Sequence, residues 1–221
     1  ESESRGLGDV YKRQVQAFLD EGGNVNAEAG DHHHIFTTGD SLLMAVCQTP
    51  YGLDFTRRHV ALAKLLVRHG ADVNHHPDVS KDGYTALHCC IDILIHNSDH
   101  EDRAIILEIL GVLVTAGANA NLRNALGETP LCMALQSNYW DSENGTQRSA
   151  FESVKLLLRA GAPLDGVRGH STAEAVLNGN LVVDELADDE HLNACRALLA
   201  DVRAAGSWKA YARAPPKALL R

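Results

Sequence analysis

Two short landmarks recur along the chain in a fixed order, and each occurs four times. The first is a Gly followed two positions later by Thr or Ser, and an apolar helical stretch comes after it. It occurs at Gly39-Asp40-Ser41, Gly83-Tyr84-Thr85, Gly127-Glu128-Thr129 and Gly169-His170-Ser171. The second is a tail with Gly first, an apolar residue fourth and Asn or Asp fifth. It occurs at Gly22-Gly23-Asn24-Val25-Asn26, Gly70-Ala71-Asp72-Val73-Asn74, Gly117-Ala118-Asn119-Ala120-Asn121 and Gly161-Ala162-Pro163-Leu164-Asp165. A unit repeated in this way buries its apolar face only against its neighbours, so the pattern predicts a stack of similar units.

The residues at the two landmarks are those that begin and end helices. Thr or Ser is a good N-cap because its hydroxyl accepts an orphan backbone N–H, and Pro130 suits an early helical position. The tail Gly suits the left-handed position after a helix, and the Asn and Asp residues that follow favour turns. Apolar residues between the landmarks fall on single helical faces, as at Ile106, Ile109, Leu110 and Leu113. Each unit is therefore predicted to be a helix, a turn, a second helix and an extended, hairpin-like loop.

The unit resembles the ankyrin repeat. The resemblance is carried by Gly83-Tyr84-Thr85-Ala86-Leu87-His88, by Gly127-Glu128-Thr129-Pro130-Leu131, and by the stretch from Leu65 to Asn74. It implies an all-α, ankyrin-type helix-turn-helix solenoid with hairpin-like loops over residues 15–206. We divide this array into a half repeat (15–26), three repeats (39–74, 83–121 and 127–165) and a degenerate terminal unit from Gly169, followed by a basic tail (207–221).

The spacing departs from the family pattern of about 33 residues. The glycines of the first landmark are 44, 44 and 42 residues apart, at Gly39, Gly83, Gly127 and Gly169. Most of the excess falls between the two helices of each unit, where it forms turns or short helical extensions. Such insertions mark a binding face, or they are neutral, because surface loops tolerate extra length cheaply. The sequence leaves both interpretations open.

The first residues look foreign to the rest of the chain. The segment 4–14 resembles a translated sequencing adapter, so we expect residues 1–14 to be non-native and the natural chain to begin upstream. The alternative is a native disordered tail.

Composition excludes several classes of function. The net charge of −9 argues against a nucleic-acid partner, whose binding proteins usually present a basic face. No stretch approaches the ~20 apolar residues of a membrane span. The five cysteines lack the spacing of a disulfide framework. We therefore expect an intracellular, cytoplasmic monomer, with the nucleus left open as a compartment.

Candidate chemical sites are each better explained structurally. His32-His33-His34 could bind a metal, but no Cys or carboxylate pair accompanies it, so a solvated loop is favoured. Cys89-Cys90 could be a redox pair, but both fall at small apolar positions, where buried thiols are common. By the family resemblance, His69 and His88 bond neighbouring loop backbones. The sequence therefore predicts no catalytic residue, no cofactor and no metal, although an enzyme using Cys90 and a histidine is retained as an alternative.

The family resemblance implies non-catalytic binding of a protein partner, at the loop tips and first helices of successive units. The loop tips fall at 76–82, 123–126 and 166–169, and Tyr139-Trp140 opens the third insertion, where it is either an exposed contact or a buried one. The predicted partner-binding residues are His76, Lys81, Tyr84, Arg123, Asn124, Tyr139 and Trp140. The protein is thus predicted to be an interaction scaffold or adaptor. The alternative is a targeting or regulatory module of a larger enzyme, such as a ubiquitin-ligase adaptor.

Overall fold

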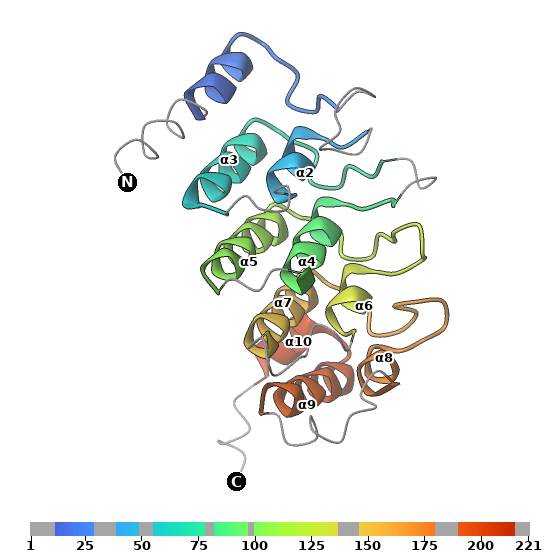
Figure 1. Ribbon diagram of the computed structural model, residues 1–221. Coiled ribbons are helices and arrows are strands. Elements are labelled where there is room, and N and C mark those ends of the chain that lie inside the picture. The colour runs from blue at the N-terminus through green and yellow to red at the C-terminus, as the bar shows by residue number, and fades with distance from the viewer. Residues whose placement is uncertain are drawn as a thin grey trace.

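Antiparallel helix pairs follow one another along the chain and stack into an elongated array (Figure 1). The computed structural model describes residues 12–28, 39–48, 55–77, 82–96, 100–136, 146–179 and 190–214. The helices are α2 (Leu42–Cys47), α3 (Arg57–Arg68), α4 (Ala86–His96), α5 (His100–Thr115), α6 (Pro130–Ala134), α7 (Gln147–Arg159), α8 (Ala173–Gly179), α9 (Glu190–Ala205) and α10 (Trp208–Arg213). A further helix covers residues 12–20.

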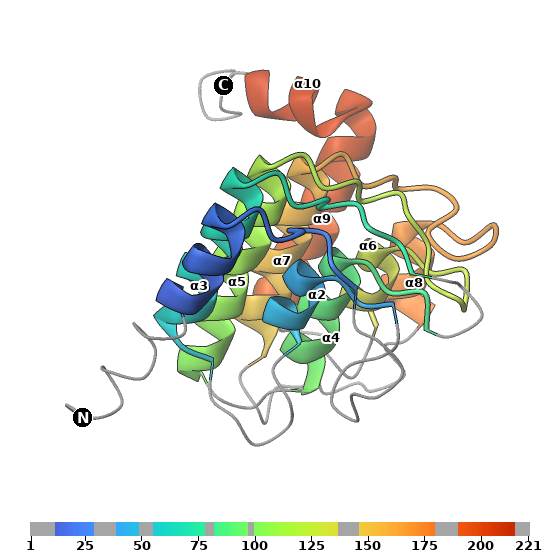
Figure 2. The same cartoon turned by 90° about the horizontal axis from the view of Figure 1, so that it is seen from above.

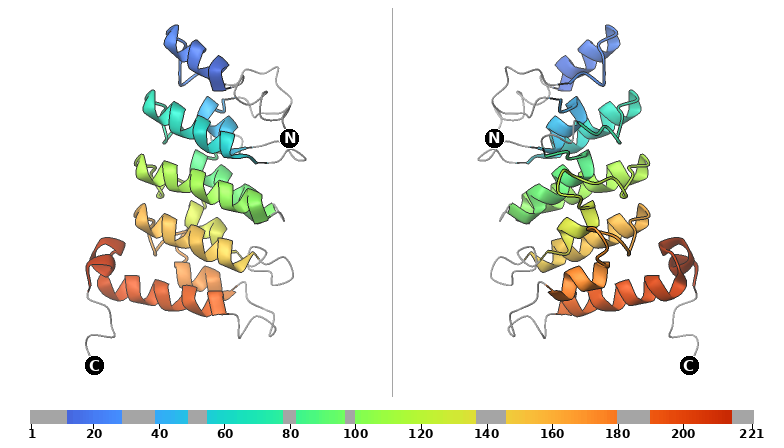
Figure 3. Two further views of the ribbon diagram at one scale, coloured as in Figure 1. Left: turned by 90° about the vertical axis from the view of Figure 1, so that its left-hand side faces the viewer. Right: turned by 90° about the vertical axis from the view of Figure 1, so that its right-hand side faces the viewer.

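The paired helices form two layers. The longer helices α3, α5, α7 and α9 pack one on the next, and the shorter helices α2, α4, α6 and α8 do the same beside them. Figure 2, which looks down the stack, shows the short helices lying between the long helices and a row of loops on one side. Figure 3 shows the same order from the side, with the last pair closing the stack. The predicted all-α fold is confirmed, and within the described ranges extended pairing is limited to isolated antiparallel bridges.

The predicted helix signals act as expected. The hydroxyl of Ser41 accepts from the N–H of Met44 at 3.3 Å, and that of Thr129 accepts from Cys132 at the same distance. Pro130 is the first residue of α6. The tail glycines take up positive φ, for example +89° at Gly117, which an L-residue adopts only with strain. Local chemistry at the landmarks therefore sets where each helix begins and ends.

The core is a continuous apolar seam between the two layers. The predicted face of α5, with Ile106, Ile109, Leu110 and Leu113, is buried in it. From α7, Val154, Leu157 and Leu158 are buried there, and Phe151 is partly buried against them. The extra length between the helices is partly helical, because α5 begins at His100 and α7 at Gln147. In the repeats 83–121 and 127–165, part of the extra length therefore extends the second helix.

Asparagines at the ends of the tails connect one unit to the next. The side-chain oxygen of Asn26 accepts from the N–H of Asp72 at 2.8 Å, and that of Asn74 accepts from the N–H of Asn119 at 2.6 Å. The next link would run from Asn121 to position 163, which is a proline and has no N–H. Asn121 instead donates its side-chain amide to Asn119 at 3.0 Å, within its own tail. We call these side-chain links between tails the asparagine ladder. The ladder therefore stops at the repeat 83–121.

Ion pairs and a short helix hold the last unit in place. Arg203 of α9 pairs with Glu174 of α8 at 2.6 Å and with Asp165 at 3.0 Å. Trp208 and Tyr211 of α10 pack against the core, with α10 in contact with α7 and α9. These two aromatic residues therefore add apolar packing at the end of the array.

The helix over residues 12–20 includes the last three residues of the adapter-like segment. Leu19 is buried at the edge of the core, whereas Phe18 is 45% exposed. The non-native origin of residues 1–14 stays a prediction, since a foreign segment can continue a helix.

Two glycines of the repeat 83–121 should respond in opposite ways to replacement by alanine. Gly117 has φ +89° and open space where a Cβ would lie, so Gly117→Ala meets only backbone strain and should destabilise by about 1 kcal/mol. Gly111 lies inside α5 with equally open space, so Gly111→Ala should stabilise by about 0.5–1 kcal/mol. Urea denaturation of both variants measures the two effects. Equal effects of the same sign would contradict the left-handed role of Gly117.

The asparagine ladder predicts unequal costs for two similar substitutions. Asn74→Ala removes a hydrogen bond between units and should cost about 1 kcal/mol of stability. Asn121→Ala removes only a contact within one exposed tail and should cost on the order of 0.3 kcal/mol of stability. Chemical denaturation measures both, and a larger loss at Asn121 would refute the break at Pro163.

Candidate functional site

Side chains of the loops donate to backbone carbonyls in the loops of neighbouring units. Nε2 of His75 donates to the carbonyl of Gly39 at 2.7 Å, one unit back, and Nε2 of His76 donates to the carbonyl of Arg123 at 2.9 Å, one unit forward. Arg123 in turn donates to the carbonyls of Gly127 at 2.6 Å and of Gly166 in the following loop. The loops are thereby joined into one edge. We call His76, residues 123–128 and residues 166–170 the loop ridge.

His88 of α4 links the layer of shorter helices to the loop ridge. Its Nδ1 accepts from the backbone N–H of Thr85 at 3.2 Å, and its Nε2 donates to the carbonyl of Glu128 at 3.1 Å. Burial lowers the pKa of His88 to about 4, because the charged ring would lose its hydration. Tyr84 stacks on the ring with centroids 5.7 Å apart, and burial raises the pKa of Tyr84 to about 12. The predicted structural role of His88 is thus confirmed.

The turn from Asn124 to Glu128 is closed by its own hydrogen bonds. The N–H of Asn124 donates to the carbonyl of Glu128 at 3.0 Å, and the N–H of Gly127 donates to the carbonyl of Asn124 at 2.9 Å. The side-chain oxygen of Asn124 accepts from the N–H groups of Leu126 at 3.0 Å and of Glu128 at 2.9 Å. Leu126 projects from this fixed turn with 70% of its surface exposed. A large apolar side chain is therefore presented to solvent on a rigid support.

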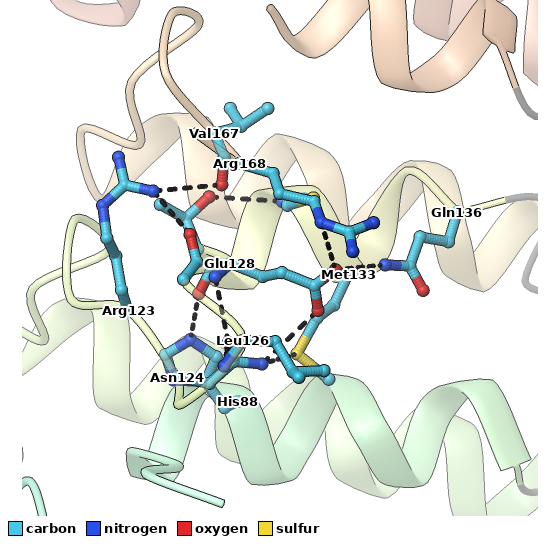
Figure 4. Close-up of polar contacts among 12 residues, drawn as sticks. His88, Arg123, Asn124, Leu126, Glu128, Met133, Gln136, Val167 and Arg168 are labelled. Carbon is cyan, nitrogen blue, oxygen red and sulfur yellow. Dashed lines mark hydrogen bonds and ion pairs between the residues drawn. The ribbon is translucent and has the colours of Figure 1, made fainter. Parts of the chain in front are cut away.

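A buried carboxylate lies beneath the turn (Figure 4). Glu128 is only 5% exposed, and it accepts from the amide of Gln136 at 3.0 Å and of Asn124 at 3.4 Å. Arg168 approaches it from the next loop, with Nε 3.4 Å from a carboxylate oxygen. The backbone N–H of Thr129 also donates to the carbonyl of Val167 at 3.0 Å. These contacts fasten the Leu126 turn to the loop of the following unit.

Four of the seven predicted partner-binding residues lie in the described part of the chain. His76, Arg123 and Tyr84 lie on or beside the ridge, and the first two are exposed. Asn124 is 3% exposed, and its side chain is used within the turn, so it shapes the loop and offers no surface to a partner. Lys81, Tyr139 and Trp140 lie outside the described residues, so their roles stay predictions.

Two residues of the loop ridge, Leu126 and Arg168, do not stand out in the sequence. Leu126 falls inside a predicted loop tip, but an apolar residue in a loop gives no sign of whether it is buried or exposed. Arg168 belongs to another loop tip, and its approach to Glu128 depends on how two loops pack. A search for apolar residues inside polar turns could have found Leu126; nothing local to the sequence points to Arg168.

The cysteines and histidines show no arrangement for chemistry in the described ranges. All five cysteines are buried, free thiols. Burial raises the pKa of Cys89 above its ordinary value, that of Cys132 to about 11 and that of Cys195 to about 12, which disfavours the reactive thiolate. No group of three or more His, Cys, Asp or Glu residues in these ranges could hold a metal ion, and His32-His33-His34 lies outside them. No helix in the described ranges is both long and apolar enough to cross a membrane.

Stacked helix pairs with interlocked loops define a helical-repeat protein. The family model described as the ankyrin repeat matches residues 82–125, from the loop before α4 to the start of the Leu126 turn. Residues 82–125 therefore carry an ankyrin repeat, and the all-α stack is consistent with the fold of that family. Repeats of this family are protein-interaction modules and are generally non-catalytic. A comparison with curated proteins finds no match to this sequence.

The lowered pKa of His88 predicts a specific loss of stability in acid. Between pH 6.5 and about 4 the unfolded chain binds a proton that the folded chain does not, so stability falls as the pH drops through this window. The contribution amounts to about 3 kcal/mol and levels off below pH 4. Denaturation at a series of pH values should show this dependence in the parent protein and in His170→Gln, an exposed control, and a clearly weaker one in His88→Gln, where the lowered pKa of His59 still contributes. An unchanged pH profile in His88→Gln would argue against the buried, neutral ring.

Proposed function

We propose that this protein is a non-catalytic interaction scaffold or adaptor that binds a protein partner along the loop ridge. The observation that carries the proposal is Leu126, which is 70% exposed on a turn closed by four hydrogen bonds of its own residues. The ankyrin-repeat match supports the class of function, and the exposed side chain on a preformed turn supports the loop ridge as the surface.

Rigidity of the turn favours binding energetically. Binding normally costs free energy to order loops and side chains at the interface, and a preformed surface avoids much of that cost. An apolar side chain at the centre of an interface can supply a large share of the affinity when its partner excludes water around it. The Leu126 turn is such a preformed surface, because its backbone is already fixed by hydrogen bonds. Its neighbours His76, Arg123 and Arg168 supply a polar rim.

The five free cysteines support an intracellular site of action. All are buried and none is paired, and a reducing compartment keeps thiols in that state. An adaptor role, in which the bound partner is brought to a further domain, would use the same ridge.

Replacement of Leu126 should reduce partner binding and leave the fold intact. A peptide-display library selected on the immobilised whole chain supplies the binders, and fluorescence anisotropy measures their affinity. Leu126→Ala should weaken the selected binders about tenfold, which corresponds to the loss of one well-packed apolar contact. Its thermal stability should change by less than about 0.5 kcal/mol, as expected for a surface position.

Phe18 provides the matched control, since it is the other large apolar residue that is exposed in the described ranges. Phe18→Ala should leave the affinities unchanged. If Leu126→Ala binds every selected peptide as tightly as the parent does, or if the library yields no binder, the ridge is not the binding surface.

A further inference from the structure

We infer that the loop ridge takes an acidic segment of a protein partner, with one apolar side chain of that segment against Leu126 and its carboxylates facing Arg123 and Arg168. The inference rests on the proposed function and adds the chemistry of the partner.

The charge of Arg123 is not neutralised by its contacts. Its guanidinium donates to the carbonyls of Gly127 at 2.6 Å, of Val167 at 3.5 Å and of Gly166. Backbone carbonyls carry a dipole but no net charge, so the group is held in place and keeps its positive charge. A cation fixed in this way presents its remaining N–H groups in a set direction, which suits recognition of a carboxylate.

Arg168 adds a second cation whose partner is buried. Its side chain is 61% exposed, and within the described ranges its ion pair is to Glu128 through Nε at 3.4 Å. That leaves the outer edge of the guanidinium facing solvent. Glu128 also accepts from Gln136 and Asn124, and at 5% exposure it offers little surface to an incoming cation. The surface of this part of the ridge is therefore positive.

Two acids of the described residues lie in the neighbouring sequence and are engaged by other groups. Asp165 pairs with Arg203 at 3.0 Å, on the side of the last unit. The carbonyl of Asp82 accepts from the N–H of Ala125 at 2.9 Å, and the charge of Asp82 acts on Tyr84. Neither acid forms an ion pair with Arg123 or Arg168 within the described ranges.

The negative charge of the whole chain makes binding of an acidic segment more specific to the positive patch around Arg123 and Arg168. The chain carries a net charge of −9, so an acidic segment is repelled by the chain as a whole and attracted where cations are exposed. Complementary charge of this kind fixes the register and orientation of a partner. An exposed apolar residue in the same loop as a cation also fits a peptide better than a nucleic acid, which is bound through a longer row of phosphate contacts.

The position of Leu126 ties the apolar and the charged contacts together. It lies three residues after Arg123 in the same loop and two residues before Glu128, the residue that Arg168 contacts. Figure 4 shows Leu126 and Arg168 on opposite sides of the Glu128 side chain, with Arg123 to the left of both. In this inference, a segment of the partner runs across the Glu128 turn from Leu126 toward the two arginines.

The test is a selection of random peptides on the whole chain, followed by anisotropy on variants of one arginine. The selected peptides should be rich in Asp and Glu around one apolar residue. Arg168→Gln should weaken them about fivefold to tenfold, Arg168→Lys should restore most of that loss because it restores the charge, and Arg159→Gln should have no effect. Arg159 is the matched control, because it is an exposed arginine at the end of α7. Melting curves of each variant verify that the array is folded.

The outcomes separate this inference from the proposed function. Peptides that lose affinity in Leu126→Ala but carry no excess of acids, or that ignore Arg168→Gln, overturn the acidic partner and leave the binding surface intact. Selected peptides that are basic also overturn it. A selection that yields no binder, or binders indifferent to Leu126→Ala, overturns both proposals.

Discussion

Hydrogen bonds from the side chains of one unit to the backbone carbonyls of another hold the loops of this chain in register. The helices alone would stack through their apolar faces, but such contacts are non-directional and would leave the loops free to shift. His75, His76 and His88 each reach a carbonyl of another unit at distances between 2.7 and 3.1 Å, and Arg123 reaches that of Gly166. The whole surface of the ridge depends on these bonds, because they turn separate loops into one edge.

Much of the fold could be predicted from the sequence because its signals are local. Ser41, Thr129 and Pro130 mark helix starts by capping chemistry, and Gly117 marks an end by its φ. The loop ridge was less predictable because it depends on contacts between units. Arg168 reaches Glu128 across two loops, a relation that no spacing along the chain records. The sequence leaves open whether the extra residues between the helices are turns or helical extensions, and the beginning of α5 at His100 shows that some are helical.

Neighbouring polar residues in the Leu126 turn have opposite roles, which periodicity could not distinguish. Asn124 is buried and uses its side chain to close the turn, whereas the adjacent Arg123 is exposed and spans to the next loop. Both are polar residues in a predicted loop tip. What separates them is the short side chain of Asn124, which bonds most easily to its own backbone. The reach of a side chain, rather than its polarity, decides whether it builds the loop or joins it to another.

Pro163 has a consequence for how the array comes apart. It removes the backbone donor that the third link of the asparagine ladder requires, between repeats 83–121 and 127–165. The loops at that interface are joined instead by the hydrogen bonds of Arg123 to Gly166 and of Thr129 to Val167, and by the ion pair of Arg168 with Glu128. The last unit is joined to Asp165 by an ion pair of Arg203. Salt screens exposed ion pairs of this kind, whereas backbone hydrogen bonds are much less sensitive to it. High salt should therefore loosen the last unit before the repeats that precede it.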